Sequence, residues 1–447
     1  MLSAGVTNAF LAGDLFNLFV SFEILLFASY VLLTLGGTHA RIRAGTIYVV
    51  VNMLSSMLFL TSIAAVYAAT GTVNLAQLSV RLGELPDSVS LVLQLMLLTT
   101  FCIKAAVFPL SLWLPDSYPT APAPVTAVFA GLLTKVGVYA ILRVQSLLFP
   151  DSPLTNLLLC AALLTMLVGA LGAIAQSDIK RMLSFTLVSH IGYMIFGIGL
   201  ASVDGFSGAI VYVVHHITIQ TSLFLVVGLV ERRGGSTSLL KLGGLARFSP
   251  LLGVLFFVPA MNLAGIPPMS GFLGKVGLID AGIQAGTPLA YVLVAAGILT
   301  SLLTLYAVAK TWNLAFWRTP EQAHEAALAI PDMSGEDAAP SLNGPIRRHR
   351  DHTHTGTTTL TSRDFDEARR ILDTDDDTDQ DLYQLIEQAA LPTRLPKLMV
   401  AATGGLIAAS LILTVAAGPL FAYTDRAATD LLDRTAYISS VLPEGTR

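Results

Sequence analysis

The stretch that decides the fold is residues 249–285, which read SPLLGVLFFVPAMNLAGIPPMSGFLGKVGLIDAGIQA. It is mostly apolar over a length that exceeds the about 20 residues a membrane-spanning helix needs. Pro267 and Pro268 interrupt it, because proline lacks a backbone donor and clashes with the preceding helical turn. Non-helical backbone at membrane depth persists only where protein or a watery cavity surrounds it. The stretch therefore predicts a broken helix inside a membrane domain.

The whole chain has the composition of a membrane protein. Of its 447 residues, 54% are hydrophobic and 13% are charged, and the mean hydropathy is +0.69. Soluble domains carry about 25% charged residues. Apolar runs long enough to span a bilayer fall at about 9–36, 45–69, 88–116, 122–147, 154–175, 180–202, 206–230, 249–285, 288–316 and 396–422. They predict an all-α, polytopic membrane protein with about ten transmembrane helices.

A second apolar run is interrupted in the same way as the first. Within residues 88–116, the helical pattern stops between Lys104 and Pro109, and Pro115 closes the run. Two interrupted helices in corresponding parts of a transporter point to its ion path. We therefore expect two discontinuous helices, and we expect both to lie beside the functional site.

Charge is concentrated in one segment, residues 317–395, which hold 16 of the 30 acidic and 8 of the 26 basic residues. We predict a transmembrane domain over 1–316, a polar and disordered loop over 317–395, a final transmembrane helix over 396–422 and a polar C-terminal tail over 423–447. The lysines and arginines of the short loops place the 317–395 loop on the cytoplasmic side. The net charge of −4 gives no indication of nucleic-acid binding.

No metal site is expected. The acidic run Asp373–Asp379 lacks the sixth-position glycine and the twelfth-position glutamate of a calcium loop. The histidines His349, His352 and His354 lie in the same polar loop, where histidine is common without a ligand role. Cys102 and Cys160 lie in apolar runs without metal or disulfide spacing, and we interpret them as small core residues.

Ionisable side chains in the middle of the predicted spans are the strongest functional signal. A charge at the bilayer centre costs at least about 2.5 kcal/mol and is a functional hypothesis by default. The residues so placed are Glu23, Lys104, Lys135, His190, His215, His216 and Lys275. By contrast Asp14, Arg43, Arg143, Lys180 and Arg181 lie near span ends, and we expect them to have structural roles.

Together these buried groups predict a proton route. Burial disfavours the ammonium form of a lysine, whereas a nearby carboxylate favours it. A lysine balanced between the two can take up and release a proton when the carboxylate moves. Histidine titrates near neutral pH when unperturbed and suits a relay between such sites.

Four stretches at these residues resemble one family, the proton-translocating antiporter-like subunits shared by Mrp cation/proton antiporters and respiratory complex I. They are residues 13–23, GDLFNLFVSFE; 108–118, FPLSLWLPDSY; 178–185, DIKRMLSF; and 265–275, GIPPMSGFLGK. The first looks like the glutamate helix of the D-type subunits of Mrp antiporters. The resemblance covers about residues 12–308 and implies a fold of two inverted five-helix repeats, each with a broken helix.

The resemblance also implies a role for each buried group. Glu23 and Lys104 would form the family's ion pair, and Lys135 would be the relay lysine. His215 and His216 would continue the central axis, and His190 belongs to the stretch that runs on from residues 178–185. Lys275 would be the terminal proton site that connects to the opposite side of the membrane.

Two departures from the family pattern keep alternatives open. Relatives usually have further helices before the glutamate helix, and many carry a lysine at the place of Gln220. The main interpretation is a D-type subunit of an Mrp-type Na⁺/H⁺ antiporter in a prokaryotic plasma membrane, with other membrane subunits as partners and without a cofactor of its own. The alternatives are a proton-pumping subunit of an NADH:quinone oxidoreductase or membrane hydrogenase, and a non-transporting assembly scaffold.

Overall fold

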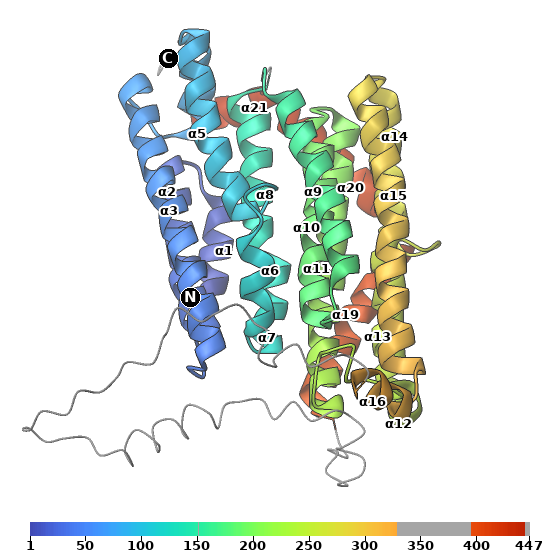
Figure 1. The fold of residues 1–447 in the computed structure, drawn as a ribbon. Helices are drawn as coiled ribbons and strands as arrows, with labels where there is room; N and C mark the ends of the chain where they lie inside the picture. The colour runs from blue at the N-terminus through green and yellow to red at the C-terminus, as the bar shows by residue number, and fades with distance from the viewer. Residues whose placement is uncertain (151, 329–394, 443–447) are drawn as a thin grey trace, which may run out of the picture.

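The computed structural model describes residues 1–150, 152–328 and 395–442, and within them every regular element is helical (Figure 1). The first half contains α1 (Leu2–Leu11), α2 (Leu15–Leu33), α3 (His39–Thr70), α4 (Leu75–Arg81), η1 (Leu82–Glu84), α5 (Asp87–Ala105), α6 (Trp113–Ser117), η2 (Tyr118–Thr120), α7 (Ala123–Val128), η3 (Phe129–Leu133), α8 (Thr134–Arg143) and η4 (Val144–Leu148). The second half contains α9 (Thr155–Ala175), α10 (Ile179–Gly199), α11 (Val203–Gly234), α12 (Leu245–Phe248), α13 (Pro250–Ala264), α14 (Ser270–Ala285), α15 (Pro288–Thr311), η5 (Trp312–Trp317) and α16 (Pro320–Leu328). The last three helices are α19 (Lys397–Val415), α20 (Ala417–Leu432) and α21 (Arg434–Val441).

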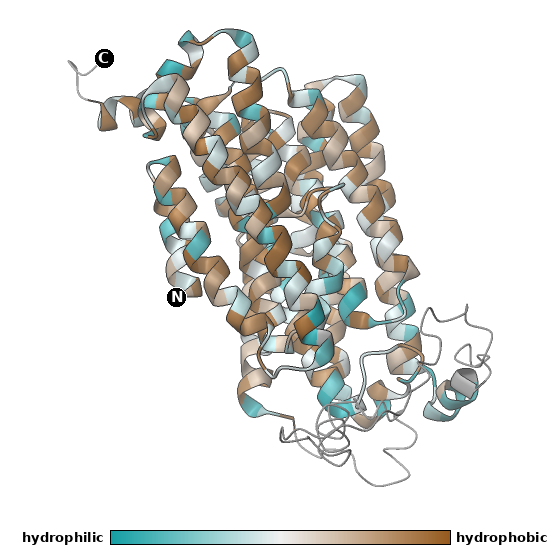
Figure 2. Cartoon of the chain, turned by 60° about the vertical axis from the view of Figure 1, so that its left-hand side comes forward, coloured by the Kyte–Doolittle hydropathy of each residue, from teal (hydrophilic) through white to brown (hydrophobic). Residues whose placement is uncertain are grey.

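The long helices stand side by side and form a multi-pass membrane domain. In the described residues, nine helical segments are long and apolar enough to cross a membrane. The tenth predicted run, 249–285, is divided into α13 and α14, which have 15 and 16 residues. Apolar residues cover the length of the bundle, and polar ones gather toward its ends (Figure 2). We call the end that holds α12 and α16 the cytoplasmic end, following the charge of the loops, and the opposite end the outer end.

The predicted first span, 9–36, is wrong as a single helix. The structure divides it into α1 and α2, with a turn at residues 12–14. Asp14 causes the division, because its carboxylate accepts a hydrogen bond of 2.6 Å from the backbone N–H of Asn17 and so caps the start of α2. The helix that carries Glu23 therefore has a short helix packed before it.

Both predicted interruptions coincide with a residue in left-handed backbone conformation. Ala106 has φ 59° and ends α5, and Gly265 has φ 87° and ends α13. Prolines follow each within a few residues and prevent the helix from resuming at once. Neighbouring helices satisfy the backbone at the breaks: Thr165 of α9 accepts the N–H of Phe108, and Thr414 of α19 accepts the N–H of Ser270.

The two halves repeat one another. Isolated backbone bridges join Asp14 to Asn74 and Asp178 to Ser238, and each residue of the second bridge lies 164 residues after its counterpart. Asp178 caps α10 as Asp14 caps α2, through a 2.9 Å bond from the N–H of Arg181. In each half the bridge is followed by a broken helix, α5–α6 or α13–α14. An odd number of spans separates the counterparts, so the second repeat lies inverted relative to the first.

The C-terminal region differs from the prediction of one helix over 396–422 followed by a polar tail. The structure ends α19 at Val415 and forms two further helices, α20 and α21. Pro419 explains the division, because it cannot donate the hydrogen bond that would continue α19 to the carbonyl of Val415. In Figure 1, α20 and α21 lie at the outer half of the bundle, near α14 and α5.

The predicted loop 317–395 lies mostly outside the described residues. Near its start, the described residues Pro320–Leu328 form the helix α16. Just before it, Arg318 donates hydrogen bonds to the carbonyls of Leu239 (2.5 Å) and Leu242 (2.8 Å), which ties the end of η5 to the segment after α11. The acidic run Asp373–Asp379 and the histidines from His349 to His354 lie outside the described residues.

The close approach of α8 to α5 at the first break yields a test of the packing. A Cβ on Gly137 would lie 2.6 Å from the backbone nitrogen of Ala105 and 2.9 Å from the carbonyl carbon of Lys104. Gly137→Ala should therefore destabilise the protein by about 1–3 kcal/mol, as overpacking does. The measurement is the midpoint of thermal aggregation of the purified protein. Gly404→Ala, where nothing lies within 4 Å, is the control and should not lower it; equal midpoints for the two variants would contradict the packing.

Candidate functional site

Glu23 and Lys104 meet through a serine. The Ser56 hydroxyl of α3 donates to Glu23 Oε1 at 2.5 Å and accepts from Lys104 Nζ at 3.0 Å. A hydroxyl can do both at once, since it carries one donor and two acceptor lone pairs. Lys104 Nζ also lies 3.4 Å from the carbonyl oxygen of Asn52. In the described residues the carboxylate and the ammonium form no direct pair within 4.0 Å, so Ser56 connects them.

The surroundings of this group are apolar on one side. Lys104 is buried in the last turn of α5, and its ammonium lies 5.7 Å from the ring centre of Phe22. Phe22, Phe59 and Phe101 pack against one another with ring centres 4.9–6.2 Å apart. In such surroundings the two charges depend on each other and on the Ser56 hydroxyl.

Lys135 is buried beside a π-helical turn. The five-residue π-helix η3 directly precedes α8, and the Lys135 ammonium donates to the carbonyl of Ala130 at 2.6 Å and lies 3.3 Å from the Thr134 hydroxyl. π-Helical turns within α-helices often occur at functional sites. A cavity of about 260 Å³ with largely apolar walls also borders Lys135, between α8 and α11 and close to Phe10 of α1.

The three predicted histidines form one cluster with two tyrosines. Their ring centres lie close together, 5.1 Å for His190 and His216 and 5.6 Å for Tyr212 and His215. The Tyr212 hydroxyl and His190 Nδ1 are 2.7 Å apart, and which atom donates depends on the imidazole tautomer. His215 Nδ1 lies 3.0 Å from the hydroxyl of Ser270, the first residue of α14. The cluster therefore joins α10 and α11 to the second break.

Lys275 binds the end of the helix that the second break interrupts. Its Nζ donates to the carbonyls of Ala264 at 3.0 Å and Leu263 at 3.3 Å, the last two residues of α13. These carbonyls have no continuing helix to pair with, and the C-terminal end of a helix carries partial negative charge. The ammonium also lies 5.2 Å from the ring centre of Tyr193, which packs against His190.

Several buried nitrogens of the histidine cluster have no hydrogen-bond partner among the described residues. They are His190 Nε2, His215 Nε2, His216 Nδ1 and His216 Nε2. Buried polar atoms of native proteins are almost always hydrogen-bonded, to protein or to ordered water. These nitrogens therefore mark the places where water is expected. Water there would link groups that the side chains alone do not connect.

The structure thus divides the predicted site into groups along the bundle. Glu23 and Lys104 form the first, Lys135 stands next, and His190, His215, His216 and Lys275 form the last. Lys135 lines one cavity with Val214 and Ile217, which flank the pair His215 and His216 in the sequence. Lys104 is linked to the helix of Lys135 by the close packing of Gly137.

Four contributing residues were not predicted from the sequence: Ser56, Tyr212, Ser270 and Asn262. Asn262 accepts the N–H of Gly271 at 2.8 Å and lies 3.2 Å from the Ser270 hydroxyl, which holds the start of α14 in place. Polar residues inside apolar runs were the available signal. Gln220 donates to the carbonyl of Leu183 at 2.7 Å, so its amide ties α11 to α10.

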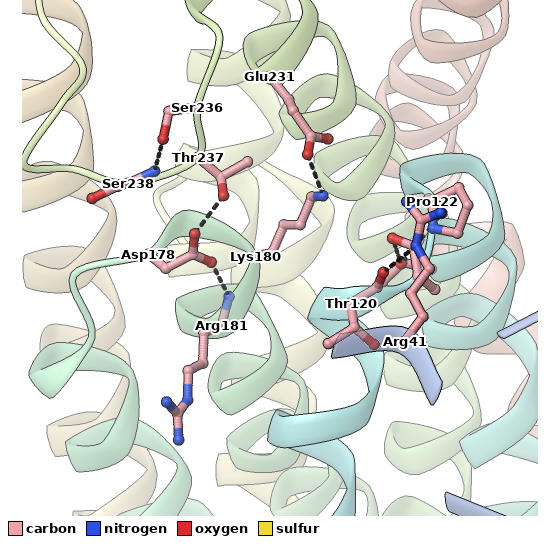
Figure 3. Close-up of polar contacts among 12 residues, drawn as sticks. Arg41, Thr120, Pro122, Asp178, Lys180, Arg181, Glu231, Ser236, Thr237 and Ser238 are labelled. Carbon is pink, nitrogen blue, oxygen red and sulfur yellow. Dashed lines mark hydrogen bonds and ion pairs between the residues drawn. The ribbon is translucent and has the colours of Figure 1, made fainter. Parts of the chain in front are cut away.

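Two of the charges near span ends, Lys180 and Arg181, form ion pairs. Lys180 pairs with Glu231 at 2.8 Å and Arg181 with Asp116 at 2.8 Å. Figure 3 shows the first pair beside Asp178, which binds both the Arg181 backbone and the Thr237 hydroxyl. These contacts connect α10 with α11 and with the segment after the first break. They fit the structural role expected for this class of charges.

A comparison with known protein families matches the part of the chain that contains these residues. Residues 12–304 match the family described as NADH:quinone oxidoreductase/Mrp antiporter, TM. The chain belongs to this family. The match includes every residue of the groups described above. In the described residues no set of three or more histidine, cysteine, aspartate or glutamate side chains could hold a metal ion.

Two similar proteins are named as subunits of an antiporter. The chain is 45% identical over 329 residues to the D subunit of the Na(+)/H(+) antiporter of Alkalihalophilus pseudofirmus, covering 73% of this chain and 66% of the relative. It is 41% identical over 336 residues to the protein of the same name in Bacillus subtilis, covering 74% and 68%. The matched part of this chain therefore spans about two thirds of the length of these relatives.

Solved structures agree with the fold. The Mrp complex from Dietzia sp. DQ12-45-1b contains a chain that superposes with a TM-score of 0.79 at 33% identity, covering 99% of this chain and 78% of that one. A chain of an archaeal respiratory membrane complex, the membrane-bound sulfane sulfur reductase, gives a TM-score of 0.76 at 22% identity, with 98% and 76% covered. The second likeness concerns the fold alone.

The bridging hydroxyl of Ser56 gives a direct test of the first group. Ser56→Ala removes hydrogen bonds to two charged groups and should destabilise the protein by about 1.5–3 kcal/mol. Ser62→Ala is the matched control, because its hydroxyl donates only to the Leu58 carbonyl of its own helix. Thermal aggregation of the purified complex measures both variants, and a Ser56→Ala midpoint no lower than that of Ser62→Ala would contradict the bridge.

Proposed function

We propose that the protein is a membrane subunit of an Mrp-type antiporter and exchanges Na⁺ for H⁺ together with other membrane subunits. The observation that carries the proposal is the series of ionisable groups inside the bundle, in which Glu23 is half-buried and Lys104, Lys135, the histidines and Lys275 are buried. The names of the relatives and the likeness to a chain of an Mrp complex support the antiporter and its partner subunits. H⁺ is then the ion that the buried groups carry.

The first group acts as a switch in this proposal. When the Glu23 carboxylate is close, it stabilises the ammonium form of Lys104; when it moves away, burial favours release of the proton. The Ser56 hydroxyl transmits small changes between them, because it contacts both. A proton released here passes toward Lys135, whose ammonium is held by a single carbonyl and a threonine hydroxyl.

The histidine cluster is the relay to the terminal site. We assign His216 and His190 to the step between Lys135 and Lys275, and His215 contacts the second break through Ser270. Imidazole can donate and accept at its two nitrogens, so it passes protons between waters. Gln220 takes no part as an acid or base, since an amide does not titrate in this range. The cluster therefore relays through its imidazoles and the waters expected beside them.

A second function rests on the shared family. The family includes subunits of NADH:quinone oxidoreductases, and the fold is also that of a chain in an archaeal respiratory complex. In that function the same residues would pump protons, and the chemistry would take place in other subunits. We place no cofactor in this chain under either function. Cation-dependent exchange in vesicles without an electron donor distinguishes the antiporter from the pump.

Removal of either charge of the first group tests the proposed function. Glu23→Gln and Lys104→Ala in the full complex should each lower cation-dependent proton flux in everted vesicles by about 100-fold or more, as loss of a group that transfers the proton does. Glu84→Gln and Lys397→Ala change exposed residues and should keep the wild-type rate. Co-purification of the partner subunits reports assembly. Retained flux in both site variants would overturn the ion-pair switch.

The terminal lysine gives an independent test of the route. Lys275→Ala should abolish flux while the complex still assembles, because the proton then has no site at the second break. Lys275→Arg retains a donor for the carbonyls of Leu263 and Ala264, yet arginine does not release its proton in proteins. The proposal therefore expects both variants to be inactive. Normal flux in Lys275→Arg would show that the residue is purely structural.

A further inference from the structure

The outer side of the second break contains a feature that the route described so far does not use. There α20 packs on α11 and α14. It brings an exposed carboxylate close to the turns of these two helices that lie between the histidine cluster and the outer end. We propose that Asp425 of α20 exchanges protons with the outer medium for Lys275, and that Leu278 is the gate between them. This inference rests on the proposed function and extends its route from Lys275 to the membrane surface.

Leu278 is the first buried apolar side chain beyond Lys275 on α14, about one helical turn toward the outer end. It fits between α10 and α11 at two glycines. A Cβ on Gly197 would lie 2.6 Å from Leu278 Cδ2, and one on Gly208 would lie 3.0 Å from the same atom. Any other residue at either position would push the leucine out. The side chain therefore closes the space between three helices next to the buried lysine.

The carboxylate lies beside this closure. Ser207, next to Gly208 in α11, donates to Asp425 Oδ1 at 2.5 Å, and its oxygen is 2.8 Å from the Thr424 hydroxyl. Ser207 and Thr424 are buried, whereas Asp425 is exposed. The Asp425 carboxylate thus reaches water on one side and a buried hydroxyl pair on the other.

The same helix also contacts α14 beside the gate. Gly277, the neighbour of Leu278, faces Phe421 of α20, and a Cβ on Gly277 would lie 2.9 Å from Phe421 Cε1. α20 therefore contacts Gly277, the neighbour of Leu278 in α14, and Ser207, the neighbour of Gly208 in α11. Asp280, the other acidic residue of α14, is exposed and accepts a hydrogen bond from Gln284. It lies on the exposed face of the helix and not toward the cluster.

A leucine in a tight socket blocks water, because an apolar constriction dewets and stops conduction. A shift of α14 about the break at Gly265 would draw Leu278 from between Gly197 and Gly208. A water chain could then join Lys275 Nζ to the Asp425 carboxylate. One proton leaves the ammonium and binds the carboxylate, so both groups become neutral, and the reverse step recharges both. Asp425 exchanges its proton with the outer medium.

Accessibility tests the gate without any transport measurement. A Lys275→Cys complex, with Cys102 and Cys160 replaced by serine, is treated from the outer side with a membrane-impermeant thiol reagent. Labelling should be slow, and adding Leu278→Ala should accelerate it by about tenfold or more, since the apolar constriction is removed. Val276→Ala, on the exposed face of α14, is the control and should leave the rate unchanged.

Leu278→Val should also accelerate the labelling, by a smaller factor. It replaces the alanine variant if that variant does not assemble. Labelling that Leu278 variants leave unchanged in an assembled complex would overturn the gate. Rapid labelling of Lys275→Cys with Leu278 intact would overturn it too.

The rate of cation-dependent proton flux tests the role of the Asp425 carboxylate. Asp425→Asn keeps an acceptor for the Ser207 hydroxyl but cannot bind a proton, and it should slow exchange by about tenfold. Asp425→Glu should restore most of the rate, and Asp430→Asn on the same exposed helix should match the wild type. Wild-type rates in Asp425→Asn would refute the role of this residue. A wild-type complex without exchange, together with the expected labelling pattern, would instead refute the proposed function and leave the gate in place.

Discussion

A buried ammonium group needs acceptors, and in this protein irregular helix geometry supplies them for Lys275 and Lys135. Lys275 binds the last two carbonyls of α13, which the break at Gly265 leaves without helical partners. Lys135 takes a carbonyl inside a π-helical turn. Lys104 stands at the end of α5, where the first break begins, but its acceptors are Ser56 and Asn52 of the continuous helix α3. The cost of burying charge is thus offset locally by backbone dipoles. The breaks place the site, and the packing of the surrounding helices maintains the breaks.

The repeat explains why two such places exist in one chain. Equivalent aspartate caps, backbone bridges and left-handed residues recur in both halves, so the same local chemistry creates two helix ends at membrane depth. The halves then diverge in their side chains. The first holds a carboxylate–serine–lysine group, and the second holds three histidines beside a lysine. In the proposed function, the first half switches charge and the second passes protons onward.

The sequence predicted the helical class, both interruptions and the burial of the lysines and histidines, because prolines and charges inside apolar runs are strong local signals; Glu23, also expected to be buried, is half-buried. It could not predict the bridge through Ser56, since a serine in an apolar helix looks the same whether it contacts its own backbone or two charges. The division at Asp14 was missed because a capping aspartate resembles an ordinary span-end charge. The C-terminal helices were missed because α20 owes its position to contacts with α11 and α14, which lie far away in the chain. Contacts of this kind are invisible to a pattern of apolar residues.

The central claim is that the buried groups from Lys135 to Lys275 form one hydrated proton route. A map of the assembled complex at a resolution that shows ordered water tests it most directly. The claim predicts water density at His190 Nε2 and at both nitrogens of His216, continuing toward Lys135 and Lys275, since these nitrogens have no hydrogen-bond partner in the part of the chain that the structure describes. A dry, fully packed cluster without water at those nitrogens would contradict it.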